Sequence, residues 1–280
     1  MERREFLYRP HIKWFQYGLV VFLALGSVLP NAVTAVARAT AGGDFLSPAA
    51  SALFFGLMTL VMFWLFRTMA STRVIVDTEG IRYLNNTKDF RVPYSEIESL
   101  KFSSIPYVGG WLKIKSHHPD IRLTVVLEEL DELVLLLKQG LDAAENQSAY
   151  QRKKLFRFYK TAGIAAHSWN RLYRHFFTLA VASLLFAVLG IAAMVFLFAS
   201  SAQGPALGLL LAAIGLTVAP GFSYVIGEVM AMIEFVRGCD EEDFVIPAAD
   251  ESKALRYYTI GFGIYAGLIT AVSTTLFLLG

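Results

Sequence analysis

The stretch 72-TRVIVDTEGIRYLNNTKDFRVPYSEIESLKFS-103 is a polar island in an otherwise apolar chain. Polar and apolar residues alternate along 73–77 and 81–84, and residues typical of turns separate these runs at Glu79–Gly80 and Asn85–Thr87. Alternation with a period of two, interrupted by turn residues, is typical of antiparallel β-strands. The residues from 93 to 98 predict a single helical turn, because Ser95 and Glu98 have the spacing of a capping box.

The pattern continues beyond this stretch to residue 142. Residues 111–116 and 121–127 alternate again, and 128–141 carry Leu at helical spacing behind an acidic first turn. We therefore predict a small domain over 72–142, with about six short strands followed by one amphipathic helix.

Composition indicates that the rest of the chain lies in a membrane. Of the 280 residues, 55% are hydrophobic and 17% are charged, whereas a soluble domain carries about 25% charged residues. The apolar residues form long blocks, which predicts an integral membrane α-helical protein with about five transmembrane helices. Two of the expected spans, 14–37 and 48–69, form an N-terminal hairpin within residues 1–71. The other three expected spans lie within residues 176–280, at 176–199, 205–227 and 257–279. A short turn is expected at 200–204, and bends are expected at Pro30 and at Pro220–Gly221.

A basic segment joins the island to the third span. Residues 143–175 combine many Lys and Arg with apolar and aromatic residues at helical spacing. This pattern is typical of an amphipathic helix lying on an anionic membrane surface. The N-terminal tail is basic as well, so the positive-inside rule predicts a cytoplasmic N-terminus and island, with the C-terminus outside. The expected location is the bacterial cytoplasmic membrane.

The phrase Val92-Pro93-Tyr94-Ser95-Glu96-Ile97-Glu98-Ser99-Leu100 and the order of elements resemble bacterial pleckstrin-homology-like (PH-like) domains of multi-pass membrane proteins. The Gly80 turn and the helix 128–141 match the opening turn and closing helix of that family. The resemblance covers residues 72–142. It implies an open β-barrel capped by a C-terminal helix, and a general binding role without one defined ligand.

Two groups of basic residues are candidates for binding lipid headgroups. The first group lies in the basic segment and consists of Arg152, Lys153, Lys154, Arg157 and Lys160. The second group lies on the predicted strands of the island and consists of Lys113, Lys115 and Arg122. The alternative interpretation of the first group is an anchor that only fixes topology. The second group could equally be the solvated face of a sheet.

Two carboxylates, Glu228 and Glu234, lie in or near the fourth expected span. Ionisable residues within a membrane often handle ions or protons, and Arg237 or the basic segment could supply their partners. Alternatively, the helix leaves the membrane near Gly227 and both carboxylates are interfacial.

No catalytic motif is present: the chain has no HExxH, no GxSxG and no P-loop, and its one cysteine is Cys239. We therefore expect no catalytic residues, cofactor, metal or nucleic-acid partner. The expected function is a non-catalytic docking or scaffolding module for a protein partner or anionic lipid, with a homo-oligomer as another possible assembly. The alternative is an accessory or regulatory subunit of a membrane transporter or channel.

Overall fold

The computed structural model describes residues 3–105, 109–200, 206–248 and 250–279 of a mostly helical chain. Five of its helices are long and apolar enough to cross a membrane, as the sequence predicts. The candidate spans are Tyr17–Thr40, Leu46–Ala70, Arg152–Ser200, Leu207–Arg237 and Ser252–Leu278. The turn expected at 200–204 and the expected first residue of the fourth span, Pro205, lie outside the described residues apart from Ser200. The chain forms two compact units, Met1–Ala162 and Gly163–Gly280.

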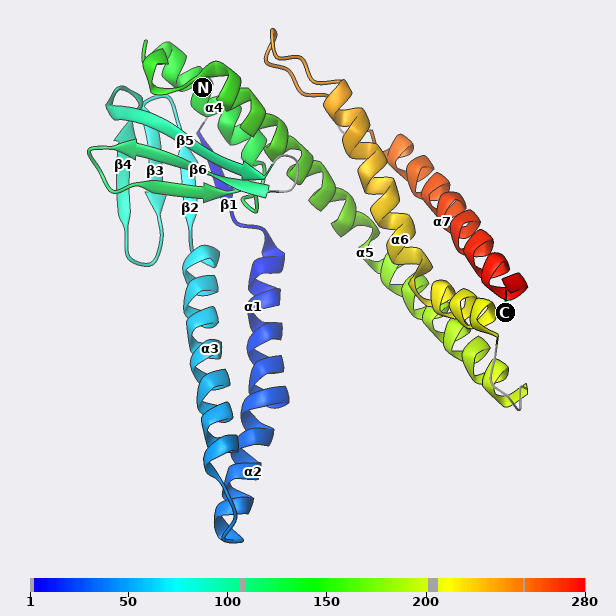
Figure 1. Cartoon of the computed structure of the whole chain (residues 1–280). Helices are drawn as coiled ribbons and strands as arrows, with labels where there is room; N and C mark the ends of the chain where they lie inside the picture. The colour runs from blue at the N-terminus through cyan, green and yellow to red at the C-terminus, as the bar shows by residue number, and fades with distance from the viewer. Residues whose placement is uncertain (1–2, 106–108, 201–205, 249, 280) are drawn as a thin grey trace. The chain divides into compact units, whose positions relative to one another are not determined.

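An antiparallel helical hairpin forms the apolar part of the first unit (Figure 1). Its first arm is built from α1 (Pro10–Leu23), a π-helical turn (Ala24–Val28) and α2 (Leu29–Thr40), and its second arm is α3 (Leu46–Ala70). The π-helical turn ends two residues before Pro30, where the sequence predicts a bend. Proline lacks the N–H that a helix needs at this point, and Asn31 donates a side-chain hydrogen bond to the Ser27 carbonyl at 2.7 Å.

The polar part of the first unit contains two small antiparallel sheets. The first has the strand order β1-β2-β3-β4 and the second the order β5-β6-β7. The described strand pairings do not join the two sheets into a closed barrel. The strands are β1 (Arg4–Leu7), β2 (Arg73–Val76), β3 (Gly80–Leu84), β4 (Asp89–Pro93), β5 (Ile97–Ile105), β6 (Gly109–Ser116) and β7 (Ile121–Thr124).

Helix α4 (Leu130–Ala143) follows the second sheet and buries the apolar face that the sequence predicts for it. Leu133, Val134 and Leu137 are fully buried. The ring of Tyr94 lies so close to Gly140 that a Cβ there would stand 2.2 Å from its Cζ atom. Tyr94 belongs to a 3-10 turn, Tyr94–Glu96, at the place where the sequence predicts one helical turn. The close approach fixes α4 against the turn between β4 and β5.

Strand β1 is the element that the sequence did not predict. It pairs antiparallel with β2, so that Phe6 lies opposite Val74 and only 2% of Phe6 remains exposed. The backbone N–H of Glu128 donates to the Leu7 carbonyl at 2.9 Å. The domain therefore includes residues from before the first membrane helix, and the helical hairpin is inserted between β1 and β2.

Helix α5 (Arg152–Ser200) runs without interruption through the expected basic segment and the third expected span. Leu155, Phe156 and Phe158 are buried at its beginning, and the Phe158 ring lies 5.3 Å from that of Phe102 on β5. The apolar side of these first turns thus packs on the domain, whereas the amphipathic pattern predicts that it lies on the membrane surface.

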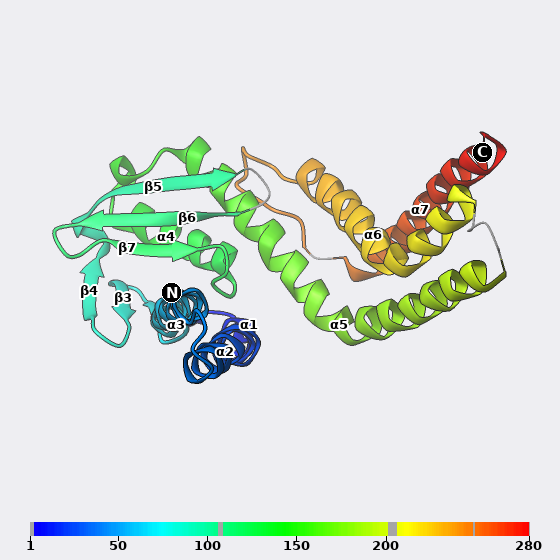
Figure 2. The same ribbon diagram turned by 60° about the horizontal axis from the view of Figure 1, so that its bottom comes forward.

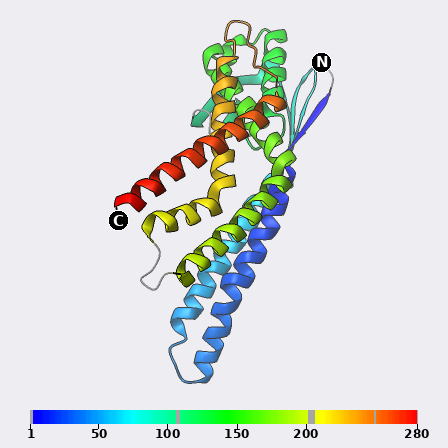
Figure 3. The same ribbon diagram turned by 90° about the vertical axis from the view of Figure 1, so that its right-hand side faces the viewer.

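The second unit contains the remainder of α5 together with α6 (Leu207–Arg237) and α7 (Glu251–Leu279). Helices α6 and α7 pack along their length, with the Phe222 and Tyr265 rings stacked at 5.3 Å. Helix α6 changes direction midway (Figure 3, yellow to orange), and Pro220 lies inside it. This is the bend that the sequence predicts, because proline removes a helical hydrogen bond.

A basic sheet face and the candidate carboxylates

The three-stranded sheet brings several predicted basic residues together. Strands β5, β6 and β7 lie side by side in Figure 2. Their register places Lys113 opposite Lys101 on one neighbour and opposite Arg122 on the other. Lys115 follows Lys113 two residues along the same strand, and so shares its face. We call these four residues, Lys101, Lys113, Lys115 and Arg122, the basic face.

This arrangement costs stability, because like charges directly opposite one another on a sheet repel by roughly 0.2–1 kcal/mol for each pair. Two contacts offset part of the repulsion. Asp120 forms an ion pair with Lys113, which lowers the pKa of that carboxyl, with smaller contributions from Lys115 and Lys101. The Arg122 guanidinium lies 4.7 Å from the centroid of the Trp111 ring. Among the described residues, Asp120 is the one carboxylate that forms an ion pair with these four cations, so this face stays positively charged.

The other basic group lies at the start of α5. Arg152, Lys153, Lys154 and Arg157 are exposed there. Lys160 is half-buried and its Nζ lies 5.3 Å from the centroid of the Phe156 ring. These cations line the polar side of a helix whose apolar side is covered by protein, so they can meet a charged partner without inserting hydrophobic side chains.

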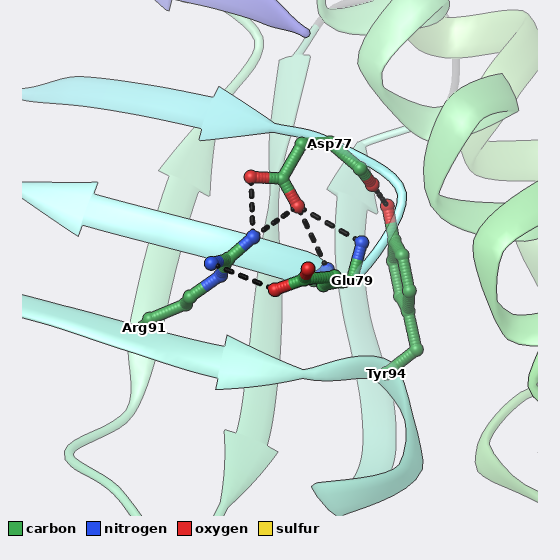
Figure 4. A network of polar contacts seen from close by, with 5 residues as sticks. Asp77, Glu79, Arg91 and Tyr94 are labelled. Carbon is green, nitrogen blue, oxygen red and sulfur yellow. Dashed lines mark hydrogen bonds and ion pairs between the residues drawn. The ribbon is translucent and has the colours of Figure 1, made fainter. Parts of the chain in front are cut away.

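A polar network lies at the turn between β2 and β3 (Figure 4). The Asp77 carboxylate accepts hydrogen bonds from the backbone N–H groups of Glu79 and Gly80 at 2.9 and 3.1 Å, and one from Arg91 Nη2 at 2.5 Å. Burial alone would raise the pKa of Asp77, but the hydrogen bonds from Arg91 and the two N–H groups outweigh it and lower that pKa.

Tyr94 completes this network by donating its hydroxyl to the Asp77 carbonyl at 3.0 Å. Burial, followed by the charge of Asp77, raises the pKa of Tyr94 to about 12. The network links the β2–β3 turn to the 3-10 turn and, through the Tyr94 ring, to α4. Its groups are occupied with one another, which is typical of a structural support.

Glu228 lies in the second unit, where three side chains hold it. Arg171 donates from Nε and Nη2 at 2.9 and 2.6 Å, Ser168 donates at 2.8 Å, and the Tyr258 hydroxyl also donates. The side chains of Arg171 and Glu228 are only 11% and 15% exposed. Arg171 comes from the basic segment that the sequence named as a possible source of partners. Glu228 therefore links all three helices of this unit.

Glu234 differs from Glu228 in that only one of its two carboxylate oxygens has a hydrogen-bond donor among the described residues. Its Oε1 accepts a hydrogen bond from Lys253 at 3.0 Å, whereas its Oε2 is buried and accepts none from the described residues. Arg237, the other partner suggested by the sequence, forms no ion pair with it in the described part of the chain.

Two residues of these clusters are not singled out by the sequence. The place of Lys101 opposite Lys113 depends on the register of the β5–β6 hairpin. The pairing of Arg171 with Glu228 depends on how α5 and α6 pack, which the many basic residues of its segment do not reveal. Within the described residues, no group of three or more His, Cys, Asp or Glu side chains could hold a metal ion.

Comparison with known proteins assigns no family to the chain: no family model matches it, and no significant match is found among curated proteins or solved structures.

Proposed function

We propose that this chain is a multi-pass protein of a bacterial cytoplasmic membrane whose PH-like domain is a non-catalytic docking module. The five apolar helices support the membrane assignment. Two antiparallel sheets followed by a closing helix support the PH-like assignment. The N-terminus and domain face the cytoplasm in this proposal, in agreement with the distribution of Lys and Arg.

The basic face carries the functional proposal. Three of its cations lie in one row across β5, β6 and β7, although this row opposes folding. An anionic surface would remove the repulsion when it binds. The face would therefore dock a protein partner with an acidic surface or an anionic lipid, with the exposed start of α5 as an additional contact.

Attachment to the membrane would strengthen weak docking. Only residues 8–9 separate β1 from α1, and only residues 71–72 separate α3 from β2. Two such short connections hold the domain at the membrane, which raises its effective concentration towards ligands located there.

The alternative function, an accessory or regulatory subunit of a transporter or channel, ranks second. The bend at Pro220 and the carboxylates favour it. Glu228, however, already has three hydrogen-bonding partners, so it serves better as a clamp between helices than as an ion-binding group.

The experiment is a pull-down from native membranes with the full chain and with a Lys101→Glu, Lys115→Glu double variant. Lys88→Glu on the exposed β3–β4 turn is the matched control. Loss of a specific protein partner from the double variant alone supports protein docking. Unchanged proteins with reduced co-purification of anionic lipid would support the lipid as ligand. If both remain unchanged, the basic face does not dock either one.

A further inference from the structure

Two cavities follow one another along the three helices of the second unit. The first, of about 260 Å³, is lined by polar and apolar side chains, and its polar ones include His167, Arg171, Glu234 and Lys253. We call it the polar cavity. The second, of about 410 Å³, is lined mainly by apolar groups, among them Leu179, Ala182 and Phe262. Along α5 the polar cavity comes first, at 167 and 171, and the apolar cavity follows at 175–182.

The apolar cavity has a physical cause in the bend of α6. Helices α5 and α6 approach closely at two places: a Cβ on Gly163 would stand 2.9 Å from Phe235 Cζ, and one on Gly190 would stand 2.8 Å from the Ala213 carbonyl oxygen. Between these contacts the Arg171–Glu228 pair also holds the two helices together. Farther along α6 lies Pro220, which itself lines the cavity. The cavity therefore lies between the Arg171–Glu228 pair and the contact at Gly190. Protein interiors are normally close-packed, and in a membrane the hydrocarbon of a lipid can fill such a space.

The polar cavity offers a ligand both a hydrogen-bond acceptor and a cation. Glu234 Oε2 is a buried acceptor without a donor among the described residues. Arg171, which also lines the cavity, uses Nε and Nη2 to bind Glu228 and Ser168, and Nη1 takes no part in these bonds. A ligand that fits both carries a hydrogen-bond donor at one position and an anionic acceptor at another, and a cationic N–H is the best donor because its hydrogen bond to a carboxylate is charge-assisted.

The location narrows the class of ligand. Glu234 lies three residues before the end of α6, and Lys253 lies two residues after the start of α7. Both helices are long and apolar enough to span a membrane, so their shared end reaches the level of the lipid headgroups. The apolar cavity lies farther along the spans, at the level of the acyl chains.

We propose that the second unit binds one phospholipid with a primary ammonium headgroup. The ammonium donates to Glu234 Oε2, the phosphodiester accepts from Arg171 Nη1, and one acyl chain occupies the apolar cavity beside Pro220. A choline headgroup has no N–H to donate, and a glycerol headgroup carries no cation. The site is separate from the basic face, so its failure would leave the docking proposal intact.

The test is native mass spectrometry of the full chain in detergent with phosphatidylethanolamine, phosphatidylcholine and phosphatidylglycerol that share the same acyl chains. We expect phosphatidylethanolamine to bind about tenfold more tightly than the other two, because it alone makes the charged hydrogen bond to Glu234. Glu234→Gln keeps the shape of the side chain and should abolish this preference. Asp243→Asn removes a carboxylate from the neighbouring exposed loop and should leave it unchanged.

A second measurement does not depend on any variant. Phosphatidylethanolamine with a photoreactive group on its acyl chain should label the cavity-lining residues of the wild-type chain, which are Thr178, Leu179 and Ala182 on α5 and Pro220, Ser223 and Tyr224 on α6. Equal binding of the three lipids would overturn the proposal. So would a preference that survives in Glu234→Gln, or labelling confined to outward-facing positions such as Phe177 and Val181.

Discussion

The substitution Phe6→Ala tests whether residues ahead of the first membrane helix are part of the folded domain. Phe6 is 2% exposed and is the buried residue of β1. Truncation of a buried phenylalanine costs about 3–5 kcal/mol. Because β1 pairs with β2 over four residues and is held beyond them by the hydrogen bond from Glu128 to Leu7, we expect this loss to detach the strand from β2.

Hydrogen exchange of the full chain in lipid nanodiscs measures the effect. A destabilisation of about 3 kcal/mol raises the population of the opened state about 100-fold, so amides of β2 (Arg73–Val76) should exchange correspondingly faster. Leu7→Ala is the matched control, since Leu7 is the next residue of the same strand but is 43% exposed. Such an exposed truncation should change stability by about 0.5 kcal/mol or less. Equal exchange of β2 in both variants would refute the assignment of β1 to the domain.

Three further substitutions test the supports of the two units by thermal or denaturant unfolding of the full chain. Gly140→Ala should destabilise the domain by about 1–3 kcal/mol, because the new Cβ collides with the Tyr94 ring. Asp77→Asn should lower stability at neutral pH. Folding lowers the pKa of Asp77, so the stability that this carboxylate contributes is present above its ordinary pKa and is lost as the pH falls through the folded-state value. The stabilities of the variant and the wild type should therefore begin to approach each other below about pH 4 and converge once the pH is below the folded-state pKa. Arg171→Met should cost about 3–5 kcal/mol because it leaves Glu228 buried without its counter-ion, and adding Glu228→Leu should restore part of the loss.

Each of these three substitutions has a control substitution elsewhere in the same chain. Gly56→Ala adds a methyl where nothing lies within 4 Å and should be neutral, so equal effects at 140 and 56 would contradict the packing argument. Asp44→Asn removes an exposed carboxylate for comparison with Asp77, and a difference from wild type that stays constant with pH would exclude the linkage at Asp77. Arg237→Gln removes an exposed cation at the end of α6, and a cost equal to that of Arg171→Met would rule out a special role for the buried pair.

Most elements of the fold were predictable because their patterns are long or strongly periodic. Five apolar blocks reach the length of a membrane span, and the apolar positions of α4 repeat at helical spacing over 14 residues. Strand β1 was not predictable in this way. Its four residues, Arg4–Leu7, are too few to distinguish alternation from chance. Its pairing partner, β2, is separated from it in the sequence by the whole helical hairpin.

The site was predictable only in part, since its parts depend on tertiary contacts. The alternation of 111–116 placed Lys113 and Lys115 on one face, but the register of β5 against β6 was needed to add Lys101. The buried acceptor at Glu234 and the cavity beside Pro220 arise from the packing of α5, α6 and α7. The apolar side of the first turns of α5 shows the same limit: amphipathic spacing shows that a face is covered, but it does not tell whether protein or lipid covers it.

Site-specific photocrosslinking in native membranes tests the docking claim most directly. A photoreactive amino acid at Ser103, an exposed neutral position facing Trp111 beside the basic face, should form a discrete adduct with the docked protein or anionic lipid. The same probe at Thr87, on the exposed β3–β4 turn, should form none. Adducts of equal yield at both positions, or an adduct at Thr87 alone, would contradict docking through the basic face.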